Sequence, residues 1–101
     1  MPKLYEYFGL VIFFYANEHE PVHVHGNCQG REGRAELIIV DGVITEIRFG
    51  GAAGRAPLAA KEAVLFKEIV TARAEDIVRK WIDFFVLNKP VPSERITRRL
   101  K

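Results

Sequence analysis

The chain has 101 residues, of which 49% are hydrophobic and 28% charged, and this composition is typical of one small globular domain. Its apolar runs are all shorter than the roughly 18 residues of a membrane-spanning helix, and Met1-Pro2-Lys3 leads into a predicted strand instead of a signal peptide. Cys28 is the only cysteine, which excludes an internal disulfide. We therefore expect a soluble, cytoplasmic protein.

The net charge of +2 is unevenly distributed along the chain. Residues 89–101 carry a net charge of +4 and leave −2 on residues 1–88. We expect residues 1–88 to form a single α+β domain and residues 89–101 to form a basic C-terminal tail or edge strand. The basic side chains of this tail are Lys89, Arg95, Arg98, Arg99 and Lys101.

Two apolar stretches near the N-terminus predict the first strands. The aromatic content of residues 4–8 favours a short strand that ends at Gly9. Residues 10–15 are almost wholly apolar and β-prone, which is typical of a central strand covered on both faces. A polar turn over residues 17–21 separates this strand from the next one, which contains His23 and His25.

The middle of the chain predicts a loop and then a hairpin. Residues 26–33 are rich in turn formers, so we expect an exposed, mobile connection there. Asp41-Gly42 is a strong hairpin signal between strands over residues 35–40 and 43–49. Alternation in the return strand places residues 43, 45, 47 and 49 on one face and residues 44, 46 and 48 on the other.

The Gly-rich linker at residues 50–57 lacks a GxxxxGK[ST] phosphate-binding motif. We therefore predict no nucleotide site and no cofactor. After this linker the spacing of apolar residues changes to that of a helix. A break within residues 71–74 is expected to divide the helical region into two helices, because Thr71 can cap a helix and Glu75-Asp76 suit its first turn. One long bent helix is the alternative. Their apolar stripes contain Val64, Leu65, Phe66, Ile69 and Val70, and then Ile77, Val78, Trp81, Ile82 and Phe85.

These elements predict an α+β fold, an antiparallel meander of about five strands followed by two helices packed on one face. Pro90 and Pro92 end the second helix. The alternating segment from Ile96 to Leu100 could be a loose arm or an edge strand. An unpaired edge beside a small core invites strand pairing between copies, so we expect a homodimer.

The strand after Pro21 places His23 and His25 on one face, because side chains alternate along a strand. Pro21 fixes its own φ and biases the preceding residue toward extended geometry, so the turn is stiff enough to hold His19 nearby. We expect the candidate catalytic residues His19, His23 and His25 to converge on one solvent-reachable surface.

The run from Phe13 to His25 resembles domain-of-unknown-function family 4160, small bacterial proteins with a Phe/Tyr-Tyr-x-Asn-x-His-x-Pro-x-His-x-His motif. A looser similarity extends to a Glu-containing strand near Glu36 and to Trp81. The resemblance implies a toxin-antitoxin-like gene pair, because members are often encoded beside small partner proteins. The motif positions in this chain are Phe14, Tyr15, Asn17, His19, Pro21, His23 and His25.

One interpretation of the histidines is a metal site. His23 and His25 point the same way and can share an ion. A catalytic zinc normally takes three protein ligands, and only these two have fixed geometry, so we expect no resident metal. Residues that could complete such a site are Glu18, His19, Glu20 and Cys28.

A second interpretation is a metal-independent ribonuclease. Histidine suits proton transfer near neutral pH, and an arginine fork suits a phosphodiester. Arg31 or Arg34, together with Tyr15, would then lie beside the histidines.

The leading interpretation is a binding component that engages a partner protein and also nucleic acid. Arg95, Arg98, Arg99 and Lys101 could follow a phosphate backbone, with Arg31 and Arg34 as further contacts. Tyr5, Tyr7 and Tyr15 could stack on bases.

Overall fold

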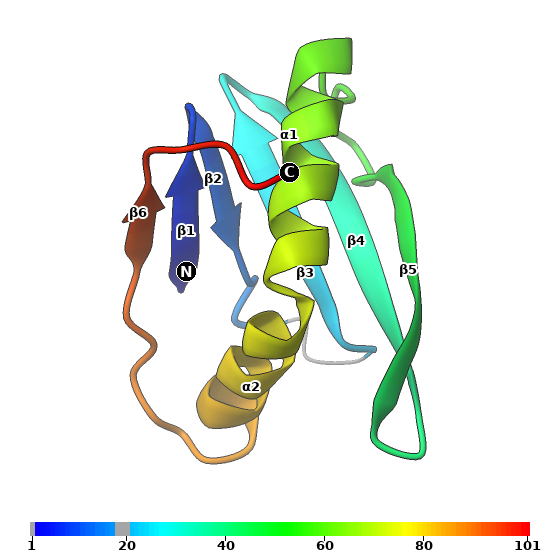
Figure 1. Cartoon of the computed structure of the whole chain (residues 1–101), viewed down its shortest axis with the longest axis vertical. Helices are drawn as coiled ribbons and strands as arrows, with labels where there is room; N and C mark the ends of the chain where they lie inside the picture. Colours follow the sequence, from blue (N-terminus) through cyan, green and yellow to red (C-terminus); the bar gives the residue numbers. More distant parts are fainter. Residues whose placement is uncertain (1, 18–20) are drawn as a thin grey trace.

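The computed structural model describes residues 2–17 and 21–101, and these form one six-stranded sheet with two helices on one face (Figure 1). The strand order is β5-β4-β3-β2-β1-β6, with antiparallel pairing from β1 to β5 and parallel pairing between β1 and β6. The predicted α+β meander with two helices on one face is confirmed. The strands are β1 (Lys3–Tyr7), β2 (Leu10–Phe13), β3 (His23–Cys28), β4 (Arg31–Val40), β5 (Val43–Gly51) and β6 (Glu94–Ile96).

Two-residue turns connect three of the antiparallel strand pairs, β1–β2, β3–β4 and β4–β5. Both central residues of each turn have positive φ, which is the type I′ geometry that matches the twist of a hairpin. The predicted hairpin at Asp41-Gly42 is confirmed. The turn residues and their φ angles are Phe8 (50°) and Gly9 (87°), Gln29 (52°) and Gly30 (82°), and Asp41 (51°) and Gly42 (78°).

The prediction of a mobile connection over residues 26–33 is wrong, because only Gln29 and Gly30 form a turn and the rest belongs to β3 and β4. Gly26 and Gly33 lie opposite each other in the β3–β4 ladder. A Cβ atom at Gly26 would lie 2.7 Å from the ring of Phe66. The two glycines therefore create the space in which this ring packs against the sheet.

The two helices are α1 (Ala60–Ala72) and α2 (Ala74–Phe85), and neither is long and apolar enough to cross a membrane. The predicted break within residues 71–74 is confirmed, although Arg73 and not Thr71 occupies the cap between the helices. Phe66, Ile69 and Val70 of α1 and Ile77 of α2 are buried against the sheet. Two members of the predicted apolar stripes are exposed instead, Val64 at 52% and Ile82 at 41%.

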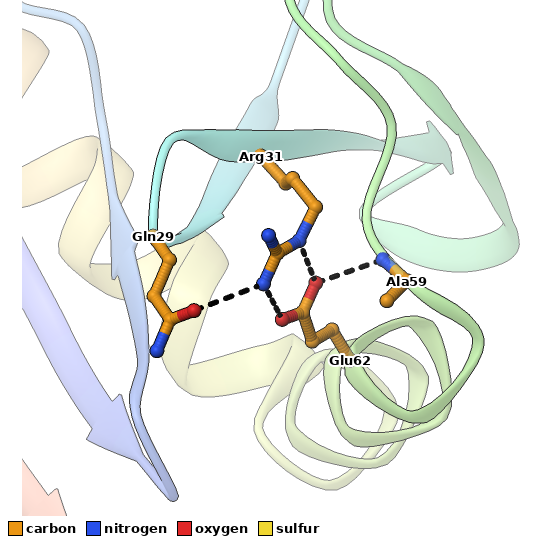
Figure 2. A network of polar contacts seen from close by, with 4 residues as sticks. All are labelled: Gln29, Arg31, Ala59 and Glu62. Carbon is orange, nitrogen blue, oxygen red and sulfur yellow. Dashed lines mark hydrogen bonds and ion pairs between the residues drawn. The ribbon is translucent and has the colours of Figure 1, made fainter.

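The start of α1 is joined to the start of β4 by Glu62 (Figure 2). Its carboxylate accepts the backbone N–H of Ala59 at 2.8 Å and the Nε–H of Arg31 at 2.8 Å. Arg31 also donates to Gln29, at 3.3 Å. The Arg31 guanidinium and the Ala59 N–H lower the pKa of Glu62 to about 2. This carboxylate therefore both caps the helix and fixes it to the sheet.

The return strand β5 contains an irregularity that the sequence does not predict. Ile38 pairs with Glu46 and Ile39 pairs with Ile44, which leaves Thr45 without an opposite residue. An extra residue of this kind is a β-bulge, and it inverts the alternation beyond it. The predicted face of Ile44 is therefore wrong, because it shares the helix-covered face with Ile47.

The C-terminal segment is docked on the domain. β6 pairs with β1, and the chain then runs back to end beside α1 (Figure 1). The N–H of Leu100 donates to the hydroxyl of Tyr7 at 2.8 Å, and Tyr7 donates to Glu68 at 2.7 Å. The guanidinium of Arg99 forms an ion pair with the same carboxylate. Arg99 and Tyr7 lower the pKa of Glu68 to about 2, so a charged network holds the tail at neutral pH.

Candidate functional site

The face of the sheet opposite the helices carries the histidines of the motif, and the prediction that His23 and His25 share one face is confirmed. In the ladders His25 lies opposite Phe13 of β2 and Arg34 of β4, while His23 lies opposite Glu36. The residue after His25, Gly26, faces α1. Side chains at positions 23 and 25 therefore project away from both helices.

Glu32 is the centre of a polar network on this histidine-bearing face, although its side chain is only 2% exposed. The hydroxyl of Tyr15 donates to both carboxylate oxygens, at 3.0 and 3.1 Å. The amide of Asn27 donates to Oε1 at 3.2 Å. Nδ1 of His25 lies 3.2 Å from Oε2, within ion-pair distance. Tyr15 and Asn27 therefore supply hydrogen-bond donors to a carboxylate that is withdrawn from water.

Aromatic rings cover this network. His25 stacks on Phe13 with ring centroids 5.6 Å apart, and Tyr15 meets His25 edge-on at 4.5 Å. His23 packs edge-on against His25 at 5.1 Å. The two histidines are 3% and 4% exposed, so the expectation of a solvent-reachable surface is wrong for them. His19, the third predicted member, lies outside the described residues.

Pro21 contributes a hydrogen-bond acceptor as well as stiffness. Nδ1 of His23 lies 2.6 Å from the carbonyl oxygen of Pro21. Because a carbonyl can only accept, this nitrogen must carry the proton. The contact fixes the tautomer of neutral His23 and orients its ring toward His25.

The described residues do not assemble the proposed metal ligands. Cys28 is on the other face of β3, because it is an odd number of residues from both histidines. Its surroundings differ accordingly, since burial and the nearby Glu62 carboxylate raise the pKa of its thiol. Within residues 2–17 and 21–101 no group of three metal-ligating side chains converges. Glu18, His19 and Glu20 lie outside this part of the chain.

The two candidate arginines of the ribonuclease interpretation lie on opposite faces. Arg31 pairs with Glu62 at the start of α1, away from the histidines. Arg34 lies opposite His25 and pairs with Glu36 at 3.5 Å. The structure therefore provides a carboxylate, an imidazole and one arginine on the same face. A carboxylate beside an imidazole can orient it for proton transfer, but here both groups are buried.

The tyrosines predicted to stack on bases hold the domain together instead. Tyr5 and Tyr7 are 0% exposed. Tyr5 donates to Asp76 of α2, and burial together with this carboxylate raises the pKa of its phenol. Tyr15 donates to Glu32. The prediction that Tyr5 and Tyr7 stack on bases is therefore wrong.

The basic residues of the tail divide between three places. Lys89 lies in the connection that follows α2, and Arg95 lies on β6, where it pairs with Glu6 at 3.5 Å. The remaining three border a groove of 690 Å³ between the tail and α1, and this groove also gains a lysine from α1. We call it the basic groove. Its charged lining residues are Lys67, Glu68, Arg98, Arg99 and Lys101.

A larger groove of 840 Å³ lies between the β4–β5 hairpin and the junction of α1 with α2. We call it the apolar groove. Val43 at its edge is 62% exposed and Ile82 is 41% exposed. Its charged lining residues are Arg73, Glu75, Asp76 and Arg79. Its aliphatic lining comprises Ile39, Val43, Ile44, Ala72, Ala74, Val78 and Ile82.

Sequence reasoning missed Glu32, Lys67 and the apolar groove. Glu32 lies in a stretch that reads as a loop, yet it alternates with Arg34 and Glu36, and this period of two was the available signal. Lys67 is far from the tail in sequence, so only the fold brings it to the basic groove. Ile82 belongs to the apolar stripe of the second helix, but the sequence does not show which residues of that stripe remain exposed to solvent.

Comparison with known proteins identifies a family and nothing closer. A sequence profile described as "Domain of unknown function (DUF4160)" matches residues 9–82, which include the histidine strand, Glu32 and both helices up to Ile82. No curated protein and no solved structure matches the chain.

Proposed function

The chain belongs to the DUF4160 family, and from this premise we propose that it is the binding component of a toxin-antitoxin-like pair whose partner protein docks in the apolar groove. The observation that carries the proposal is a concave surface with exposed aliphatic side chains, Val43 and Ile82. Exposed apolar patches with charged rims are typical of protein interaction sites. The gene pairing implied by the family resemblance supplies a small protein as the occupant.

Charged side chains of both signs lie among the lining of the groove and define the chemistry of this partner. Arg79 is 71% exposed although it contacts Asp76 at 3.4 Å, and Glu75 is an exposed carboxylate of the same lining. A partner segment with aliphatic side chains flanked by an acidic and a basic residue would bury the patch and pair with Arg79 and Glu75. Aliphatic burial would provide most of the affinity, and the charges would favour one orientation.

The test is co-expression with the protein encoded by the adjacent gene. We expect the two proteins to co-purify and Ile82→Asp to weaken binding by at least about tenfold, because the aspartate would be desolvated in the interface. Binding is measured by calorimetry. The matched control is Val64→Asp, since Val64 is 52% exposed on α1 and does not line the groove. Equal binding by wild type and Ile82→Asp would contradict the proposal.

A second function, nucleic-acid binding, is favoured by the basic groove. Four basic side chains and one acidic side chain line it, and Arg99 is partly neutralised by its ion pair with Glu68. Arg98 and Lys101 are exposed. These residues could contact consecutive phosphates without reading sequence.

Charge reversal of Arg98 and Lys101 is expected to abolish measurable binding to single-stranded RNA or DNA at moderate salt. Wild-type affinity should fall steeply with salt, because phosphate contacts release counterions. Fluorescence anisotropy measures both effects. Point variants are preferable to deletion of residues 93–101, which would also remove β6 and the contact of Leu100 with Tyr7. Arg55→Glu, in an exposed loop, is the control, and equal affinity of all three proteins would exclude the groove.

A further inference from the structure

The outer edge of β5 is the long unpaired edge of the sheet. β5 is an end strand of nine residues, and no described residue pairs with it on the side away from β4 (Figure 1). A strand edge presents backbone N–H and C=O groups that a second strand can satisfy. We propose that two copies of this chain pair antiparallel along β5 and form a symmetric dimer. The residues at the centre of this interface, Glu46, Ile47 and Arg48, line neither groove.

The charges on this edge are complementary to their own copy. Glu46 and Arg48 share the face opposite the helices, where their partners in β4 are Ile38 and Glu36. Their side chains are 53% and 63% exposed and contact each other along the strand at 3.0 Å. Ile47, between them, faces the helix side and is half-buried.

A two-fold axis perpendicular to the sheet selects one register. Such an axis keeps each side chain on its own face, so a residue must lie opposite one of the same face. With Ile47 at the axis, Glu46 of each copy faces Arg48 of the other. A register centred on Glu46 or on Arg48 would set like charges directly opposite, which is destabilising. The charge pattern therefore specifies pairing about Ile47.

The sequence predicts a homodimer through the tail, whereas the structure favours β5. The other edge strand, β6, has only three residues. Beyond it, Arg99 and Leu100 contact Glu68 and Tyr7 of the same chain. The bulge at Thr45 bends β5 and confines regular pairing to the residues around Ile47. A short ladder with two reciprocal ion pairs predicts a dimer that depends on concentration and weakens with salt.

The test uses charge reversal and sedimentation velocity. Wild type should sediment as a species of 11.5 kDa at low concentration and approach twice this mass at tens of micromolar. Glu46→Arg makes both edge charges positive and Arg48→Glu makes both negative, so each variant alone should weaken self-association by at least about tenfold. An equimolar mixture of the two variants should restore a dimer, because the edge of one variant is then wholly positive and the edge of the other wholly negative.

The double variant carrying Glu46→Arg and Arg48→Glu should also dimerise like wild type, because exchanging the charges preserves the pairing. Lys61→Glu, an exposed charge reversal on α1, is the matched control and should leave the dimer intact. Thermal melting of each variant checks that the fold survives, which we expect because both side chains are mainly exposed. A wild-type protein that stays at 11.5 kDa, single variants that dimerise normally, or a mixture that remains monomeric would each overturn the proposal.

Discussion

Replacing Glu32 with glutamine is expected to lower the free energy of unfolding by about 2–4 kcal/mol, a large part of the stability of a small domain. The carboxylate is 2% exposed and accepts from Tyr15 and Asn27 while His25 lies 3.2 Å away. An amide brings its own N–H donors toward these donors, so at least one buried group would lose its partner. Urea denaturation at a fixed m-value measures the change.

Glu36→Gln provides the matched control for this substitution. Glu36 lies on the same strand and face, but its side chain is 27% exposed and its contact with Arg34 is long, at 3.5 Å. Its replacement should cost less than about 1 kcal/mol. Combining Glu32→Gln with His25→Gln completes a double-mutant cycle, and coupling above about 1 kcal/mol is expected. Equal effects of the two glutamate variants would mean that the network contributes little to folding.

Gly26→Ala is expected to destabilise the domain by about 1–3 kcal/mol through overpacking. A Cβ atom there would lie 2.7 Å from two ring atoms of Phe66 and 3.4 Å from Ile12. The ring cannot retreat freely, because Phe66 is 3% exposed within the core. α1 would have to move away from β3 to relieve the clash. The shift in the urea midpoint is the measurement.

Gly50→Ala tests whether this cost is specific to Gly26. Gly50 is also a strand glycine with no positive φ, but a Cβ atom there would meet nothing within 4 Å. Its substitution should change stability by less than about 0.5 kcal/mol. In the Gly26→Ala background, Phe66→Leu should cost less than it does in wild type, since the smaller side chain relieves the contact. An identical cost in both backgrounds would show that the ring is not the obstacle.

The parts of the fold that the sequence predicts are those set by local chemistry. Asp41-Gly42 dictates a hairpin through its positive φ angles, and the break near Arg73 follows from the change in the helical stripes. Gly26 could not be interpreted in this way, because its role depends on Phe66, which is distant in the chain. The bulge at Thr45 likewise depends on pairing with β4 and leaves no local signal.

The sequence predicts which face of the sheet carries the two histidines of the candidate site, but it does not predict how deeply they are buried. Alternation alone places His23 and His25 on one face. Their burial results from packing against the rings of Phe13 and Tyr15, which lie on a neighbouring segment. This packing depends on two segments together, so neither segment alone predicts it. Glu32 was hidden because glycines surround it, and two of these glycines serve the opposite face of the sheet. The network is therefore a property of three segments together.

The parallel pairing of β6 with β1 couples two strands that the ribosome makes at very different times. β1 spans Lys3–Tyr7 and β6 spans Glu94–Ile96, so all the other strands and both helices are synthesised between them. At a translation rate of about 5–20 residues per second, the outer edge of β1 remains unpaired for several seconds or more before β6 is synthesised. During translation the unpaired edge of β1 is open to pairing with other nascent chains. Pairing with β6 therefore occupies this edge of β1 only at the end of synthesis.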